Sequence, residues 1–329
     1  GVYFLREGDT FKKAEFIQGN KVYTMNAVGS KLFISTKLEN VLYDGSKVSF
    51  MGNGFPKAKI RDVYVNDVDI VYLADKQVIY KKGNKYIAEN LDFGNSKAKI
   101  KSYSNFNGIE YFGTSNGLWR RSDDQGLRLI KELNVLSLEH DRLKTLFVGT
   151  KKGLYYLKNG KLSRYSPNKL ETKDFSKIAV NDIEFINKYE IWYATFGQGL
   201  FLQDMGTIQN FNQRDGLKSG GMVFDMVNWK GKTYIATKNG LFVYSGGNIS
   251  KHYTKNQGLP SNIILDMDTY DGFDFIWLAT SNGISKFDGT NFINYSTNLG
   301  LPSKLVTAIH VDRTEDNTVW SGSDKSGLT

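Results

Sequence analysis

The stretch FIWLATSNGI, residues 275–284, joins an apolar run to a short polar turn and decides how the rest of the chain is interpreted. Its signature is Gly or Ala followed by Thr, a short turn, and then Gly with an aliphatic residue. Clear copies lie at Gly113-Thr114, Gly149-Thr150, Ala194-Thr195 and Ala236-Thr237, and weaker ones at Ser35-Thr36, Ala74-Asp75 and Gly322-Ser323. Successive residues at the Thr position are 36 to 45 apart, which is the spacing of a repeated four-stranded unit. The sequence therefore predicts a repeat array.

Residues 261–296 show the organisation expected of one repeat. Apolar or alternating runs predict an inner strand near 263–268, a second near 275–280, a third near 284–287 and a more polar outer strand near 291–295. Turn residues separate them, such as the Asp-Gly pair at 288–289. A sheet of this kind must stack on its neighbours to bury its faces, so the predicted fold class is all-β.

The two ends of the chain carry complementary parts of one more repeat. Residues 1–9 resemble a third strand, while 306–311 and 318–322 resemble first and second strands. If these ends pair, residues 1–329 form a single domain, a closed β-propeller of eight four-stranded antiparallel blades. The alternative has seven blades, from about residue 22 to 296, with both flanks belonging to a neighbouring propeller. The eight blade marks are Thr36, Asp75, Thr114, Thr150, Thr195, Thr237, Thr280 and Ser323.

Composition narrows the function classes. Lys and Arg number 43 against 34 Asp and Glu, for a net charge of +9. The scattered lysines indicate either solubility or a mild attraction for anionic partners, and no basic cluster interleaved with aromatics predicts nucleic-acid binding. The absence of Cys excludes disulfides, thiolate nucleophiles and Cys-based zinc sites. No apolar run approaches a membrane span and no signal peptide is visible at Gly1, so a secreted or anchored protein would contain this chain as a piece.

Residues able to support catalysis are few. His140, His252 and His310 lie on different repeats without metal-binding spacing, so neither a metal site nor a cofactor is expected. His310 either lines the channel or is a satisfied structural imidazole, and Asp266 is expected to accept a hydrogen bond from a turn backbone. No nucleophile elbow or phosphate loop occurs, so intrinsic enzymatic activity and catalytic residues are not expected.

The recurring positions of the repeat have a structural interpretation. The hydroxyls of the signature threonines are expected to bond neighbouring backbone. Trp192, Trp277 and Trp320 share one strand position and should pack between blades, with each indole N–H finding a backbone acceptor. Trp119 lies outside this position and is not assigned to a ligand site.

Variation on one face of a fixed scaffold is the better guide to binding. The turn between strands two and three is predicted to open beside the link to the next blade, around the mouth of the channel. Amide, lysine and aromatic side chains in these turns would suit hydroxyl-rich sugars, carboxylated ones included, although for each residue taken alone ordinary solvated turn chemistry is the preferred explanation. The candidate ligand-binding residues are Phe196, Gln198, Lys151, Lys152, Lys238, Asn239, Ser115, Asn116, Ser281 and Asn282.

The repeat resembles the two-component regulator propeller repeat. Trp277, Thr280, Gly283, Ile284 and Asp288 match its pattern, and the tract GLPSN at 258–262 matches the link between blades. The likeness spans nearly the whole chain but is degenerate over residues 20–90, where blade boundaries are uncertain from sequence. WD40 and kelch repeats fit poorly, because Trp-Asp and Gly-His dipeptides are absent and paired glycines are rare.

The resemblance implies the sensor ectodomain of a hybrid two-component histidine kinase of the Bacteroidetes type. It implies a periplasmic or extracellular location and an oligosaccharide ligand, neutral or anionic, with the signal passed by rearrangement of subunits or domains. Implied partners are a neighbouring propeller, the signalling domains of the parent protein and a second copy of the chain. The alternatives are a protein-interaction platform and, third, a polysaccharide-cleaving enzyme.

Overall fold

A computed structural model provides the structure of the chain. It describes residues 2–5, 10–14, 17, 22–28, 31–44, 47–51, 54–65, 70–95, 97–141, 145–165, 177–185, 190–204, 207–211, 222–270, 272–301, 303–311 and 318–323. All the blade marks and all the predicted site residues lie within these ranges. No helix in them is both long and apolar enough to cross a membrane.

The described strands form eight four-stranded sheets, seven continuous in sequence and one made from both ends of the chain. The strand pairings within them are antiparallel, as between β28 and β29. The chain divides into two compact units. Unit 1 comprises Gly1–Ala74, Ile79–Ala88 and Phe224–Thr329, and unit 2 comprises Asp75–Val78 and Glu89–Val223. The predicted all-β class is confirmed.

Five sheets lie wholly or mainly in unit 1. The sheet that combines the chain ends holds β2 (Lys12–Lys13), β1 (Val2–Leu5), β32 (Val319–Gly322) and β31 (Ala308–Val311). The next two hold β3 (Val22–Val28), β4 (Lys31–Thr36), β5 (Asn40–Tyr43) and β6 (Val48–Phe50), and then β7 (Asp62–Val65), β8 (Ile70–Leu73), β9 (Gln77–Lys82) and β10 (Lys85–Asn90). The remaining two hold β23 (Val223–Trp229), β24 (Lys232–Thr237), β25 (Gly240–Ser245) and β26 (Asn248–Tyr253), and then β27 (Ile264–Asp268), β28 (Ile276–Thr280), β29 (Gly283–Phe287) and β30 (Phe292–Tyr295).

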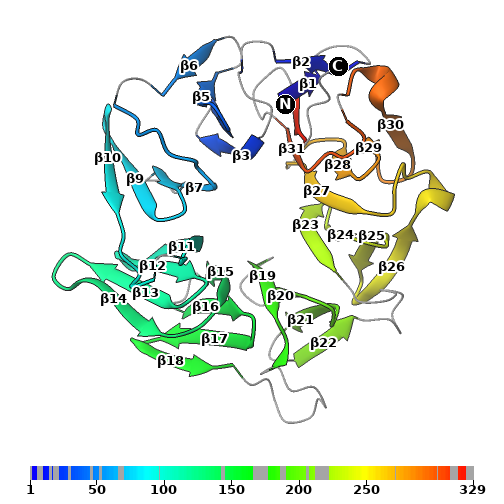
Figure 1. Cartoon of the computed structure of the whole chain (residues 1–329). Helices are drawn as coiled ribbons and strands as arrows, with labels where there is room; N and C mark the ends of the chain where they lie inside the picture. Colours follow the sequence, from blue (N-terminus) through cyan, green and yellow to red (C-terminus); the bar gives the residue numbers. More distant parts are fainter. Residues whose placement is uncertain are drawn as a thin grey trace. The chain divides into compact units, whose positions relative to one another are not determined.

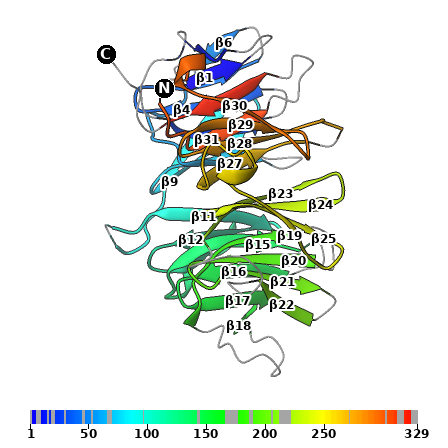
Figure 2. The same cartoon turned by 90° about the vertical axis from the view of Figure 1, so that its right-hand side faces the viewer.

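Three sheets lie in unit 2, and Figure 2 shows their strands side by side. They hold β11 (Ile100–Phe106), β12 (Ile109–Thr114), β13 (Leu118–Ser122) and β14 (Gly126–Lys131), then β15 (Val135–His140), β16 (Thr145–Thr150), β17 (Gly153–Lys158) and β18 (Lys161–Arg164), and then β19 (Val180–Phe185), β20 (Glu190–Thr195), β21 (Leu200–Asp204) and β22 (Thr207–Phe211).

The pairing of the two chain ends is confirmed. In the sheet of blue β1 and β2 and red β31, Tyr3 lies opposite Ser321 and Phe4 opposite Trp320 (Figure 1). The two flanks are therefore partners in one sheet, and the count of eight sheets includes it.

The repeat signature lies at the end of each second strand, where atoms of the neighbouring strands leave little room for a side chain. β28 is buried along its whole length, and its threonine Thr280 is fully buried. A Cβ atom at Gly149, in the same position of β16, would stand 2.2 Å from the Ser137 Oγ and 2.7 Å from the Val180 carbonyl oxygen. The position before the threonine is therefore Gly, Ala or Ser because a neighbouring strand fills the room a larger side chain would need.

Core clusters lie between successive sheets, as expected for stacked sheets. One cluster joins Leu118 and Leu138 of neighbouring sheets in unit 2, and another joins Phe33 and Tyr72 in unit 1. The expected packing between blades is confirmed for Trp277 and Trp320, whose core clusters include residues of the next sheet, and Trp192 is fully buried. The expectation of a backbone acceptor is wrong for Trp277, because its buried indole N–H has no hydrogen-bond partner.

The tract between repeats forms a short capped turn. The 3-10 turns η3 (Lys255–Gln257) and η4 (Thr297–Leu299) each end at a glycine. Gly258 has φ 108° and Gly300 has φ 90°, a left-handed conformation that glycine adopts without a steric cost. The following Leu259 is buried, so the link is anchored to the core.

Candidate functional site

A threonine fixes the turn after six of the second strands. The Thr280 hydroxyl donates to the carbonyl of Gly283 at 2.7 Å, and the Thr150 hydroxyl donates to that of Gly153 at 2.7 Å. The same bond runs from Thr36, Thr114, Thr195 and Thr237 to the carbonyls of Glu39, Gly117, Gly199 and Gly240. The predicted structural role of these hydroxyls is confirmed. The turns are therefore held in a set conformation, with their middle residues left for other contacts.

The ten predicted site residues all lie in these turns, but in different units. Those in unit 2 are Ser115, Asn116, Lys151, Lys152, Phe196 and Gln198, and those in unit 1 are Lys238, Asn239, Ser281 and Asn282. Phe196 is 64% exposed, while its backbone N–H donates to the Ala179 carbonyl at 3.0 Å. Each residue is therefore placed where a ligand could reach its turn, and their role in binding stays a prediction.

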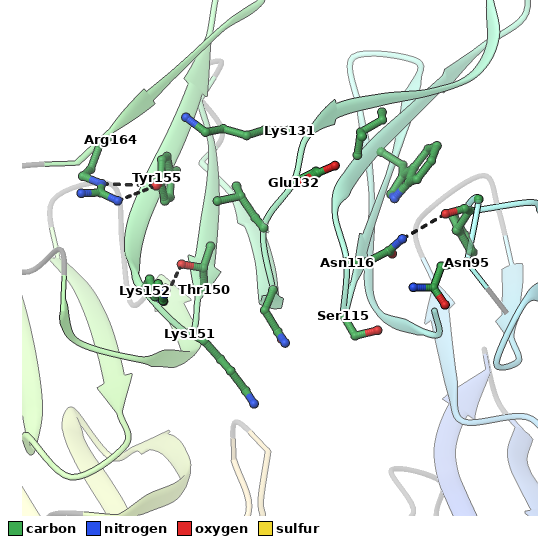
Figure 3. Close-up of a pocket in the computed structure, with 16 residues that line it drawn as sticks. Asn95, Ser115, Asn116, Lys131, Glu132, Thr150, Lys151, Lys152, Tyr155 and Arg164 are labelled. Atoms are coloured by element: carbon green, nitrogen blue, oxygen red, sulfur yellow. Dashed lines mark hydrogen bonds between the residues drawn. The ribbon is translucent and has the colours of Figure 1, made fainter. Parts of the chain in front are cut away.

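A cavity of about 1000 Å³ in unit 2 collects four of these residues (Figure 3). It is lined by two links between sheets, 93–95 and 132–134, and by two turns after second strands, 115–116 and 150–152. Ser115 and Asn116 come from one sheet and Lys151 and Lys152 from the next. We call it the Lys151 cavity. The link and the turn thus open on the same side, as the sequence predicts.

The walls of the Lys151 cavity add aromatic and cationic side chains that the sequence did not single out for a site. Arg164 donates to the Tyr155 hydroxyl from its Nε at 3.2 Å and its Nη2 at 2.8 Å. The Lys131 ammonium lies 5.4 Å from the centre of the same ring, and Figure 3 shows both side chains directed at Tyr155. Trp119 also lines the cavity.

The strand register is the signal that could have found them. Tyr155 of β17 lies opposite Arg164 of β18, and Trp119 of β13 lies opposite Leu129 of β14. Both pairs begin two residues after the glycine of the repeat signature, so aligning the repeats on that glycine places one pair on each wall.

The cavity is more cationic than anionic. Lys131, Lys151, Lys152 and Arg164 line it, and Glu132 is the one carboxylate among the lining residues. Burial and the charge of Lys151 together lower the pKa of the neighbouring Lys101, whose ammonium donates to Asn134 Oδ1 at 2.8 Å. Crowded positive charges at a cavity favour an anionic group in their midst.

Part of the polar lining already has a structural partner. The Asn116 side-chain amide donates to the Phe93 carbonyl at 3.0 Å, and the Asn282 amide donates to the Pro260 carbonyl at 3.0 Å in the same way. These asparagines tie the turn to the preceding link. Their amides thus fix the shape of the rim, while the residues Lys151 and Lys152 are exposed.

The histidines are engaged in separate structural contacts. His252 stacks on Phe242 with ring centres 3.9 Å apart, and His310 Nδ1 lies 2.8 Å from an Asp268 oxygen. His140 Nδ1 lies 3.2 Å from the Ser104 hydroxyl. Across the described ranges, no group of three or more His, Asp and Glu side chains is placed to hold a metal ion.

Inner-strand carboxylates bond the neighbouring sheet, which corrects the expectation for Asp266. Its Oδ2 accepts from the Ile309 N–H of β31 at 2.8 Å, not from a turn backbone. Asp225 makes the equivalent bond from β23 to the Met267 N–H of β27 at 2.7 Å. Burial, with the nearby Asp225 charge, raises the pKa of Asp266 well above its usual range. The expectation of a turn partner was wrong because sequence alone cannot show which backbone an inner-strand side chain faces.

Comparison with known proteins identifies the fold. No protein-family model matches the chain, and no curated protein shows significant sequence similarity. Similar solved structures include the extracellular domain of BT4673, a one-component system of B. thetaiotaomicron, with a TM-score of 0.57 and 16% identity over 96% of this chain and 51% of that one. The chain is a β-propeller. The predicted likeness to sensor ectodomains is thereby confirmed at the level of the fold.

Two further structures have similar folds. The extracellular domain of the hybrid two-component system BT3049 of B. thetaiotaomicron has a TM-score of 0.55 and 16% identity over 96% of this propeller and 53% of that chain. The computationally designed Ika8 protein has a TM-score of 0.66 and 14% identity over 94% and 95% of the two chains. The propeller spans about half the length of the two natural domains.

Proposed function

We propose that this propeller is the extracytoplasmic ligand-sensing domain of a two-component regulator, and that it binds an oligosaccharide in the Lys151 cavity. The observation that carries the proposal is the meeting of Ser115, Asn116, Lys151 and Lys152, chosen from sequence, around one cavity of about 1000 Å³. A cavity of this size can enclose much of a short oligosaccharide, and convergent polar groups can orient it.

The chemistry of the walls favours an acidic sugar. Arg164 and Lys131 can bind a carboxylate, while the rings of Trp119 and Tyr155 offer apolar faces to the C–H side of a pyranose. A sugar hydrolase ordinarily needs two carboxyl groups flanking the bond to be cleaved. Glu132 is the one carboxylate in the lining, so binding without cleavage is the better supported activity.

The sensing role is supported by the shared fold with extracellular domains of one- and two-component systems. Because those domains are about twice as long, the propeller would act together with further parts of its parent protein. A ligand can shift the arrangement of those parts only if it binds one arrangement more tightly than the other. We propose that the cavity makes this distinction through neighbouring domains or a second subunit.

Calorimetric titration with neutral and uronic-acid oligosaccharides tests the proposal. We expect the acidic sugars to bind, and the variants Lys151→Ala and Arg164→Ala to weaken that binding by about tenfold each, the equivalent of about 1.4 kcal/mol. Lys161→Ala is the matched control, because Lys161 is an exposed lysine in the same blade outside the cavity lining. Absence of binding at millimolar sugar, or equal affinity in all three variants, would reject the cavity as the site.

A further inference from the structure

A second cavity, in unit 1, has a different character. Its volume is about 820 Å³, and its lining comes from the β4–β5 turn, the end of β6 and the link at 55–59. We call it the Phe50 cleft. Phe50 is 63% exposed and Leu38 is 69% exposed, so two large apolar side chains meet solvent at one cavity.

The other blades provide an internal comparison for these positions. Phe50 of β6 lies opposite Val41, which is the strand position where Arg164 lies opposite Tyr155 in the Lys151 cavity. Leu38 is the second residue after its signature threonine, where Asn116 and Lys152 stand in the blades around that cavity. This blade thus carries Leu38 where both sugar-site blades carry a polar residue, and Phe50 where one of them carries Arg164 and the other Leu129. Neighbouring exposed apolar side chains of this kind mark an interaction surface.

The base of the Phe50 cleft is firmly packed. Phe55 makes edge contacts with Tyr72 and Tyr86, at ring-centre distances of 5.1 and 4.9 Å. The Asn40 side-chain amide donates to the Ala58 carbonyl at 2.9 Å, joining the turn to the link. A preformed cleft avoids the ordering cost that weakens binding to a loose surface.

The positive charge around the Phe50 cleft favours an acidic partner. Lys37, Lys57 and Lys59 are exposed around the cleft, against a single carboxylate, Glu39, among the lining residues. The Lys59 ammonium lies 4.1 Å from the centre of the Tyr23 ring, which holds it at the rim. A bilayer would require protruding apolar groups, whereas Leu38 and Phe50 line a concave surface.

We propose that the Phe50 cleft docks an acidic polypeptide segment of a partner protein. A bulky apolar side chain of the segment packs between Leu38 and Phe50, and its flanking carboxylates pair with Lys37, Lys57 and Lys59. Complementary charge would steer the partner and fix its register, while the apolar contact supplies most of the affinity. This site is separate from the Lys151 cavity and does not depend on sugar binding.

Fluorescence anisotropy with three labelled synthetic peptides tests this docking. One peptide carries a central Phe between Asp and Glu residues, the second replaces that Phe by Ala, and the third replaces the acidic residues by Lys. We expect only the first to bind well, with affinity falling as salt rises. We expect Phe50→Ser and the double variant Lys57→Glu/Lys59→Glu each to weaken it by about tenfold or more.

Two controls keep the result decisive. Ile293→Ser removes another exposed apolar residue, 55% exposed on an outer strand, and should leave peptide affinity unchanged. Arg164→Ala should also leave it unchanged, which separates this site from the sugar site. The lysine variants alter only exposed charges, so loss of folding does not explain their effect. Equal binding of all three peptides, or retained affinity in Phe50→Ser, would overturn the proposal. So would Phe50-dependent binding of anionic lipid vesicles or Phe50-dependent dimerisation without peptide binding.

Discussion

Thr280 shows how one side chain stabilises a turn of the repeat. Its fully buried hydroxyl donates to the Gly283 carbonyl and accepts from the Asn282 N–H at 3.1 Å. Replacing it by valine keeps the shape but leaves both backbone groups without this partner. We expect Thr280→Val to lower the free energy of unfolding by about 1–3 kcal/mol, measured by urea denaturation. The exposed Thr290→Val should change it by less than about 0.5 kcal/mol, and equal effects of the two substitutions would refute the role given to the buried hydroxyl.

At this scale, the sequence predicted the framework better than the site. The role of the threonines followed from their recurrence before a glycine, because the repeat samples one local geometry several times. Lys151 and Ser115 were found because they occupy the turn itself. Arg164 and Lys131 were missed, because they lie on or at the end of outer strands and reach the cavity only through cross-strand register. That register depends on tertiary pairing and not on local pattern.

At the scale of strands, carboxylates join the inner strands β23 and β27 to the next blade. Asp268 Oδ2 accepts from the Val311 N–H at 2.8 Å, and Val311 is fully buried. We expect Asp268→Ala to cost about 1–3 kcal/mol, because it leaves a buried donor unsatisfied. Thermal and urea unfolding would measure the loss. Asp274→Ala removes an exposed partner of Lys230 and should cost under about 1 kcal/mol. A smaller loss in the Asp268 variant than in this control would contradict the cross-blade role.

Residues 20–90, where the repeat pattern is weakest, still contribute to ordinary four-stranded blades. Glu39 stands where other repeats have glycine, yet its carbonyl accepts the Thr36 hydroxyl at 3.1 Å as the glycine carbonyls do. Asp75 replaces a signature threonine, and its carboxylate pairs with Lys99 at 2.9 Å while its carbonyl accepts from the Ile100 N–H. Strands β4 and β8 keep their buried residues, so burial and backbone bonding preserve a blade after its signature has been lost. Sequence alone could not show this substitution of one bonding pattern for another.

For the whole molecule, buried acids make stability depend on pH. Burial, with the nearby charge of Asp182, raises the pKa of Glu139 from 4.5 to about 7, and burial also raises the pKa of Asp182 and Asp62. At a pH between the unfolded-state pKa and the raised folded-state pKa of each group, the folded chain therefore keeps a proton that the unfolded chain has released. The contribution of these protonated carboxyl groups to stability is complete below their pKa in the unfolded chain. It is lost as pH rises through their pKa in the folded chain.

The variant Glu139→Gln should remove part of this dependence. We expect it to raise the free energy of unfolding by about 2 kcal/mol at about pH 8.5 and to leave it nearly unchanged at about pH 4.5. Urea midpoints across this range would show the difference as a flatter profile. Glu132→Gln, at an exposed glutamate, should follow the wild-type profile. A wild-type stability that increases steadily with pH between 5 and 7 would contradict the assignment, because acids with a raised pKa in the folded chain make stability fall over this range.

The sheet shared by β1, β2, β31 and β32 has a consequence for biosynthesis. Strand β1 leaves the ribosome about three hundred residues before its partner β32, so the sheet stays incomplete while the residues between them are synthesised. Until then, an unpaired β1 and the open flank of its neighbouring blade are exposed to wrong partners. A chaperone that shields nascent strands would therefore act chiefly on the segment around β1.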